Sequence, residues 1–155
     1  MVKIGKRFKW EMGHRLLKSY SEPCQNLHGH SYEMEVIIEG TLNQDGVVLD
    51  FGLLKEIVSP IVESLDHSLV LCKDDVLVPI ISEQGLKLNV VPYNPTAENM
   101  AIDIVESIMS HFADVEGINS VTVKIWETRT GWVEASMTKE EFFAKLEEND
   151  NEVQG

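Results

Sequence analysis

Two stretches of alternating polarity near the start of the chain constrain its fold most. In residues 2–14 the even positions are mostly apolar, and the odd positions are mostly charged. Residues 28–38 repeat this alternation, with Ile37 as the exception. Because successive side chains of a strand point to opposite faces, each stretch predicts a strand with one buried face. We expect strands over 2–14 and 29–40, paired antiparallel across the polar loop between them.

Three of the five histidines fall at the adjoining ends of these predicted strands. His14 closes the first strand, and His28 and His30 open the second, all with the parity of the apolar face. Since antiparallel pairing brings the end of one strand beside the start of the next, the hairpin gathers the three imidazoles on one face. Three imidazoles with an open fourth position are typical of catalytic Zn²⁺. The alternative is that His14 is an ordinary half-buried histidine and the other two belong to the loop.

Downstream, helical periodicity predicts a layer of helices, and renewed alternation predicts a second pair of strands. Asp50 and Thr96 stand where N-caps are expected, and Pro60 should bend the first helix. The expected elements are a helix from 51 to about 64, a short helix ending at Gly85, a short strand near 88–91, a helix from Thr96 through Phe112, strands 120–128 and 132–137, and a short last helix capped by Thr138 and Glu141. This order predicts an α+β fold, a four-stranded antiparallel sheet with helices on one face.

Length, charge and cysteine content limit the class of protein. The 155 residues predict a single domain, residues 1–146, followed by an acidic tail, 147–155, which we expect to be disordered. The formal net charge of −13 argues against nucleic acid or a membrane as a partner. Without an apolar run of about 18 residues or a signal segment, and with Cys24 and Cys72 as free thiols, we expect a cytoplasmic protein.

Cys24 and the pair Asp66-His67 carry groups suited to proton transfer. Cys24 lies four residues before His28, and a thiol beside a cation can act as a base or a nucleophile. It could instead be a fourth metal ligand or an inert loop thiol, and as an isolated feature it is more typical of an inert thiol. A carboxylate beside an imidazole can tune a proton carrier. Asp66-His67 could instead be a polar pair that ends the preceding helix.

Glu127 and the segment 94–99 are candidates for binding a small molecule. Glu127 has the parity of the apolar face of strand 120–128, and a buried carboxylate needs hydrogen-bond donors. A ligand with N–H groups would supply them, whereas the alternative is a rim glutamate paired with a basic side chain. The free N–H groups after Thr96 could hold an anion or a heterocycle, or the segment is simply a helix cap.

Six short motifs follow one another along the chain: Gly13-His14-Arg15-Leu16, Cys24-x-x-x-His28-Gly29-His30, Val48-Leu49-Asp50-Phe51, Leu65-Asp66-His67, Asn94-Pro95-Thr96-Ala97-Glu98-Asn99 and Trp126-Glu127-Thr128. In this order they resemble the 6-pyruvoyltetrahydropterin synthase superfamily, over a stretch from Phe8 to about Ala135. A gap of three residues between Cys24 and His28 is most similar to its 6-carboxytetrahydropterin synthase branch. Two stretches depart from the family pattern: Ser68 to Leu71 replaces a segment that often contains asparagine, and residues 73–93 are longer than in compact members.

The resemblance implies a role for each candidate residue. Zn²⁺ would be the cofactor, Cys24 the catalytic thiolate, and Asp66 with His67 the proton-transfer pair. Glu127 would anchor a pterin, with Thr96 nearby. The metal ligands would be His14, His28 and His30, and the candidates for binding phosphates are Arg15, Lys18 and Arg129.

The resemblance also implies a reaction and an assembly. The substrate would be 7,8-dihydroneopterin triphosphate, converted by a carbon–carbon lyase of queuosine biosynthesis to 6-carboxy-5,6,7,8-tetrahydropterin, acetaldehyde and triphosphate. The alternatives are a 6-pyruvoyltetrahydropterin synthase, or a zinc- and pterin-binding module without catalysis. The family fold is the tunnelling fold, in which sheets join edge to edge into a barrel. It implies a homohexamer of two stacked trimers with active sites between subunits.

Overall fold

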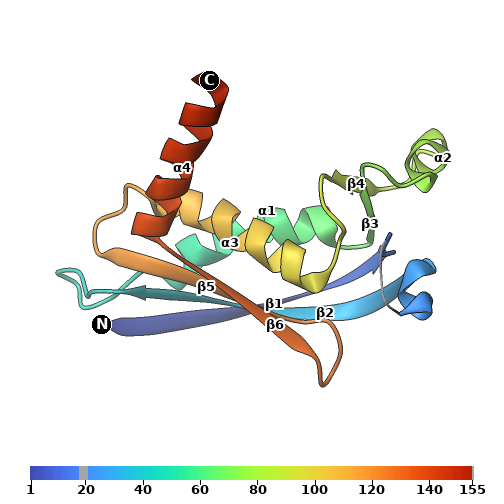
Figure 1. The fold of residues 1–155 in the computed structure, drawn as a ribbon. Coiled ribbons are helices and arrows are strands. Elements are labelled where there is room, and N and C mark those ends of the chain that lie inside the picture. The colour runs from blue at the N-terminus through green and yellow to red at the C-terminus, as the bar shows by residue number, and fades with distance from the viewer. Residues whose placement is uncertain (18–20, 155) are drawn as a thin grey trace.

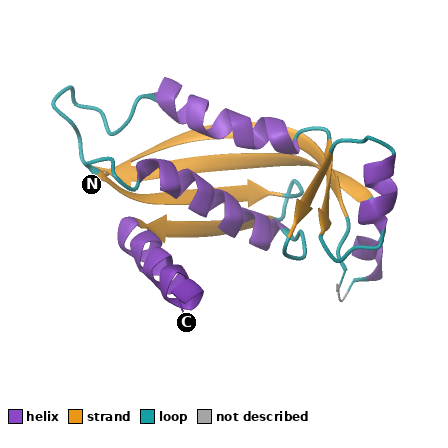
Figure 2. Ribbon diagram, turned by 90° about the horizontal axis from the view of Figure 1, so that it is seen from above, coloured by secondary structure: helices purple, strands orange, loops and turns teal. Residues whose placement is uncertain are grey.

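The computed structural model describes residues 1–17 and 21–154, which form one six-stranded sheet with α1 and α3 against one face (Figures 1 and 2). The strand order is β4-β3-β1-β2-β5-β6. The strands are β1 (Val2–His14), β2 (His28–Gly40), β3 (Ser68–Cys72), β4 (Leu88–Val91), β5 (Ile118–Trp126) and β6 (Trp132–Thr138). The helices are α1 (Phe51–Leu65), α2 (Leu77–Glu83), α3 (Ala97–Phe112) and α4 (Lys139–Gln154), with a 3₁₀ turn η1 (Glu22–Gln25).

The predicted hairpin is confirmed. β1 and β2 pair antiparallel along their whole length, with His14 opposite His28 and Met12 opposite His30. Burial follows the alternation of polarity, since Met12 and Tyr32 are buried while Glu11 between two buried neighbours is exposed. The pattern of the sequence therefore sets both the register and the face that meets the helices.

The prediction of a four-stranded antiparallel sheet is wrong, because the sheet has six strands and is mixed. β3 pairs parallel with the end of β1, and β4 pairs parallel with β3. The short helix α2 connects these two strands. β3 is a continuous apolar run with buried residues at four of its five positions, so it lacks the alternation that marks a half-buried strand.

Two helices cover the apolar face of the sheet and enclose the core. α1 begins where the side chain of Asp50 accepts hydrogen bonds from the N–H groups of Gly52 and Leu53, and Pro60 lies inside this helix. α3 begins where the Thr96 side chain accepts from the N–H of Asn99. Both predicted N-caps are confirmed. The fully buried core side chains include Met34, Val36, Leu54, Val58, Ile108, Met109, Val123 and Ile125.

The last helix, α4, is longer than expected. The capping box is present, with the Thr138 N–H donating to the Glu141 carboxylate and the Glu141 N–H donating to the Thr138 hydroxyl. Phe142 packs into the core, and the helix then continues through the acidic residues 147–154, projecting from the domain (Figure 1). Residues 147–154 of the segment that we expected to be a disordered tail are thus helical, and Gly155 lies outside the described residues. In the described residues, the helices are too short or too polar to cross a bilayer.

Candidate metal centre

The three-histidine cluster of His14, His28 and His30 forms at the end of the hairpin, as predicted. One ring nitrogen from each residue lies within 4.8 Å of those of the other two. His14 is 1% exposed, whereas His28 and His30 are half-buried. The cluster is therefore closed on the side of His14 and accessible on the side of β2.

Backbone carbonyls determine which nitrogen of two imidazoles faces the centre. Nδ1 of His14 lies 2.7 Å from the carbonyl oxygen of Pro95, and Nδ1 of His28 lies 2.7 Å from that of Asn26. Because a carbonyl oxygen only accepts, each Nδ1 must carry the proton and donate. In the neutral ring the remaining nitrogen, Nε2, is then a bare lone pair.

These two lone pairs converge. Nε2 of His14 lies 3.1 Å from Nε2 of His28, and in the neutral rings with protonated Nδ1 neither of these two nitrogens carries a proton. Two ligands of a tetrahedral Zn²⁺, at about 2.0–2.1 Å from the metal, are separated by roughly 3.3 Å. The spacing and the donor set therefore fit a divalent cation of this type, with the second nitrogens held as such sites require.

Burial keeps two of these imidazoles neutral. Desolvation lowers the pKa of His14 below its ordinary 6.5, with the Pro95 carbonyl and Glu127 opposing the shift. Desolvation likewise lowers the pKa of His30, with Glu127 opposing and His28 adding to the decrease. Since a metal ligand must be unprotonated, both shifts favour metal binding at pH 7.

Glu127 lies beside the cluster. Its Oε1 atom is 3.6 Å from Nε2 of His14 and 3.8 Å from Nε2 of His30. Tyr32 donates a hydrogen bond of 3.4 Å to the same oxygen, and burial raises the pKa of this tyrosine, so it remains a donor. In the described part of the chain, these contacts are made with histidine and tyrosine and not with the arginine or lysine of the alternative interpretation. Glu127 instead presents a carboxylate toward the open side of the cluster.

Sequence analysis missed Tyr32, although a signal was available. Tyr32 has the same strand parity as His28 and His30. Its ring stacks on Trp10 at 5.2 Å between centroids and meets the edge of His30 at 5.6 Å. The carbonyls of Pro95 and Asn26 were also missed, and for these no signal exists because every residue has a carbonyl.

Asp66 and His67 form a hydrogen-bonded pair that is attached to the backbone of β1. Asp66 Oδ2 lies 2.9 Å from Nδ1 of His67, and Asp66 Oδ1 accepts the Glu11 N–H at 2.9 Å. The His67 N–H donates to the Glu11 carbonyl, which holds His67 at a φ of 54°. The hydrogen bond from Glu11 and then that from His67 lower the pKa of Asp66. Asp66 is also the C-cap of α1, with its N–H donating to the Val62 carbonyl, so the pair both ends this helix and forms a hydrogen-bonded carboxylate–imidazole couple.

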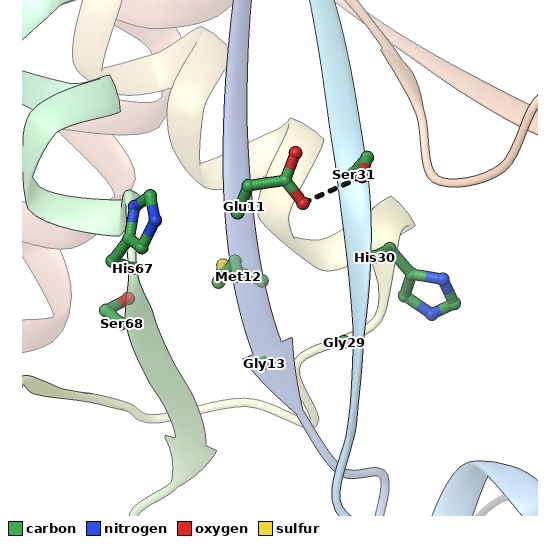
Figure 3. Close-up of a pocket in the computed structure, with 8 residues that line it drawn as sticks. All are labelled: Glu11, Met12, Gly13, Gly29, His30, Ser31, His67 and Ser68. Carbon is green, nitrogen blue, oxygen red and sulfur yellow. Dashed lines mark hydrogen bonds between the residues drawn. The ribbon is translucent and has the colours of Figure 1, made fainter.

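The Asp66-His67 pair does not converge with the three-histidine cluster within one chain. An open pocket of about 340 Å³, lined by residues that include Glu11, Ser31, His67 and His30, lies between them. Figure 3 shows His67 beside β1 and the ring of His30 on the other side of β2, pointing away from His67. Within a single chain, the two groups therefore open in different directions.

Cys24 lies in η1 and is half-buried. Its backbone N–H donates to Ser21, and its carbonyl accepts from the N–H of Leu16 at 2.9 Å. These contacts fix the turn that carries the thiol. In the part of the chain that the structure describes, they do not join that thiol to the histidines or to Asp66.

The candidates for binding phosphates have different surroundings. Arg15 forms an ion pair with Asp75, whose side chain is fully buried. The Nε atom of Arg15 lies 2.9 Å from Oδ2 of Asp75. Arg129 lines an open pocket of about 490 Å³ together with Arg7. Lys18 lies outside the described residues.

Comparisons with known proteins identify relatives of this chain. The family model described as 6-pyruvoyl tetrahydropterin synthase matches residues 3–138. A Rickettsia bellii protein named 6-carboxy-5,6,7,8-tetrahydropterin synthase is 34% identical over 138 residues, covering 86% of this chain and 99% of its own. A Haemophilus influenzae protein of the same name is 32% identical over 143 residues, covering 86% and 98%.

Solved structures share the fold. The 6-pyruvoyl tetrahydropterin synthase of Plasmodium falciparum superposes with a TM-score of 0.72 at 18% identity, covering 88% of this chain and 98% of its own. An uncharacterized protein from Wolinella succinogenes gives a TM-score of 0.72 at 23% identity, with coverage of 86% and 97%. With a family match over nearly the whole sheet and relatives above 30% identity, this chain belongs to the 6-pyruvoyl tetrahydropterin synthase family.

Proposed function

We propose that this protein is a zinc-dependent carbon–carbon lyase acting in the cytoplasm, in queuosine biosynthesis. It would convert 7,8-dihydroneopterin triphosphate and water to 6-carboxy-5,6,7,8-tetrahydropterin, acetaldehyde and triphosphate. The names of the curated relatives support this choice of product. Its main structural support is the pair of bare Nε2 lone pairs of His14 and His28, 3.1 Å apart beside Glu127.

His14, His28 and His30 would hold the zinc ion. When bound, Zn²⁺ would polarise the oxygens of the substrate side chain and acidify the neighbouring C–H and O–H bonds. Glu127 would accept hydrogen bonds from the N–H groups of the pterin ring, oriented by Tyr32. Thr96, the N-cap of α3, would lie close to the bound pterin. Its hydroxyl oxygen accepts a hydrogen bond from the N–H of Asn99.

Proton transfer would be the task of Cys24 and the Asp66-His67 pair. The Cys24 thiolate would take a proton from the substrate, and His67 would relay it. Asp66, hydrogen-bonded to Nδ1 of His67, would orient the ring. His67 has a left-handed backbone conformation, which is unfavourable for a residue other than glycine. Such strained residues are found mostly at functional sites, where the surrounding contacts hold them in place, and this supports the proposed role.

These groups would meet in a homohexamer of two stacked trimers, in which a neighbouring copy completes each site. The side chain of His67 is 76% exposed, so its ring is available to a second chain. Edge strands β4 and β6 carry unpaired backbone groups that edge-to-edge association would satisfy.

Incubation of zinc-loaded protein with 7,8-dihydroneopterin triphosphate, followed by mass spectrometry, tests the proposal. The expected products are the 6-carboxy pterin and acetaldehyde. A 6-pyruvoyl product without acetaldehyde would assign the alternative synthase activity. Bound zinc and pterin without turnover would indicate a binding module.

The role of Cys24 can be tested with the chain's other thiol as a control. Cys24→Ala should abolish turnover and leave zinc content unchanged. Cys72→Ala, at a buried position in β3, should retain turnover. Full activity of Cys24→Ala would contradict the assigned role.

A further inference from the structure

We infer that Asn94 is a positioning residue of the metal centre, which fixes His14 and the Cys24 turn relative to α3. It lies in the segment between β4 and α3, far from the hairpin in sequence. This inference rests on the metal site of the proposed function. Capping of α3 does not explain an asparagine at this position, because Thr96 is the N-cap.

Three hydrogen bonds hold Asn94 in place. Its side-chain oxygen accepts the N–H of Leu17 at 2.9 Å. Its carbonyl accepts the N–H of Thr96 at 2.7 Å and the side-chain amide of Asn99 at 2.9 Å. A residue before proline is also restricted to extended backbone conformations. Asn94 is thus fixed both to the first turn of α3 and to the loop after β1.

The next residue acts directly on the metal ligand. The Pro95 carbonyl accepts the Nδ1 proton of His14 at 2.7 Å, and this contact is buried. The segment from His14 to Leu17 is therefore attached to the segment Asn94-Pro95 at two points. One attachment fixes the ring of the ligand, and the other fixes the backbone three residues later. If the hydrogen bond between Leu17 and Asn94 is removed, only the hydrogen bond between His14 and Pro95 holds the segment.

The same segment carries the Cys24 turn. Leu16, between the two attachment points, donates its N–H to the Cys24 carbonyl. Loss of the Asn94 acceptor would leave the N–H of half-buried Leu17 unpaired, which favours a local opening. We therefore expect one substitution to loosen both the His14 ring and the Cys24 turn, although Asn94 would touch neither metal nor thiol.

Three variants separate this role from general stability. Asn94→Ala removes the acceptor. Asn94→Asp keeps an oxygen at the same position and should restore it. Asn89→Ala is the matched control, because the Asn89 side chain bonds Ser64 and Ser68 instead of the loop after β1.

The first measurement is the affinity for Zn²⁺ by chelator competition. Asn94→Ala should bind zinc about tenfold more weakly than the parent, at the lower end of the effects found for outer partners of metal ligands. Asn94→Asp and Asn89→Ala should stay within about twofold of the parent. Equal zinc affinity in Asn94→Ala and Asn89→Ala would overturn the inference.

The second measurement is the rate of Cys24 alkylation by iodoacetamide in metal-free protein carrying Cys72→Ala. Asn94→Ala should raise this rate by about two- to tenfold, the factor expected for one lost hydrogen bond, and Asn94→Asp should reverse the increase. An unchanged rate would refute the coupling to the Cys24 turn. If the parent protein binds no zinc, the proposed function fails, whereas this second measurement still tests the inference.

Discussion

The contact between Tyr32 and Glu127 allows a prediction with a defined magnitude. Tyr32→Phe removes one oxygen atom and leaves the ring, which is almost fully buried, in its stack on Trp10 and against His30. Packing should therefore be unchanged. What is lost is the hydrogen bond of 3.4 Å to Oε1 of Glu127.

A hydrogen bond to a charged group contributes about 1.5–3 kcal/mol when it is short and buried. This one is long, and the Glu127 side chain is 34% exposed, so water can replace the lost donor in part. We therefore expect the less well oriented carboxylate to weaken the binding free energy of the pterin by about 1 kcal/mol, which corresponds to roughly fivefold weaker binding.

The assay is equilibrium binding of 7,8-dihydroneopterin triphosphate to zinc-loaded protein carrying Cys24→Ala, which prevents turnover. Glu127→Gln should weaken binding more than Tyr32→Phe does, since it removes the charge itself. Tyr93→Phe is the control, because its hydroxyl bonds Asp103 instead. Undiminished binding in Tyr32→Phe, alongside weakened binding in Glu127→Gln, would refute the reasoning.

Three further predictions concern the metal ligands, acidification and the helix cap. His14→Ala should abolish stoichiometric zinc binding, whereas His111→Ala at an exposed position should leave it intact, as measured by elemental analysis. In the metal-free protein, His14 is neutral in both folded and unfolded states above pH 6.5. As the pH falls below 6.5, His14 is protonated in the unfolded chain before it is protonated in the folded protein. The free energy of unfolding should therefore decrease between pH 6.5 and the lowered pKa of His14 in the folded state. Urea titrations across this pH range measure the decrease. Thr96→Ala should cost about 1 kcal/mol of unfolding free energy through loss of the cap, while Thr96→Ser should restore it in the same titration.

Local pattern alone determined the part of this protein that brings the three histidines of the proposed metal site together. Strand alternation fixed which face His14, His28 and His30 share, and antiparallel pairing placed His14 opposite His28. The N-caps Asp50 and Thr96 were equally readable, because a cap depends on the side chain at one position and the helix that follows. These features involve neighbours in sequence or a single hairpin, so periodicity is sufficient to predict them.

Tertiary structure decided the features that depend on distant segments or on backbone atoms. β3 joins β1 in parallel through a connection that includes α1, and its apolar run carries no alternation to mark its face. The Pro95 carbonyl that orients His14 comes from 81 residues away and has no side-chain identity. Arg15 likewise could not be assigned to Asp75 from the sequence, because the partner of a charge depends on which loops the fold brings together.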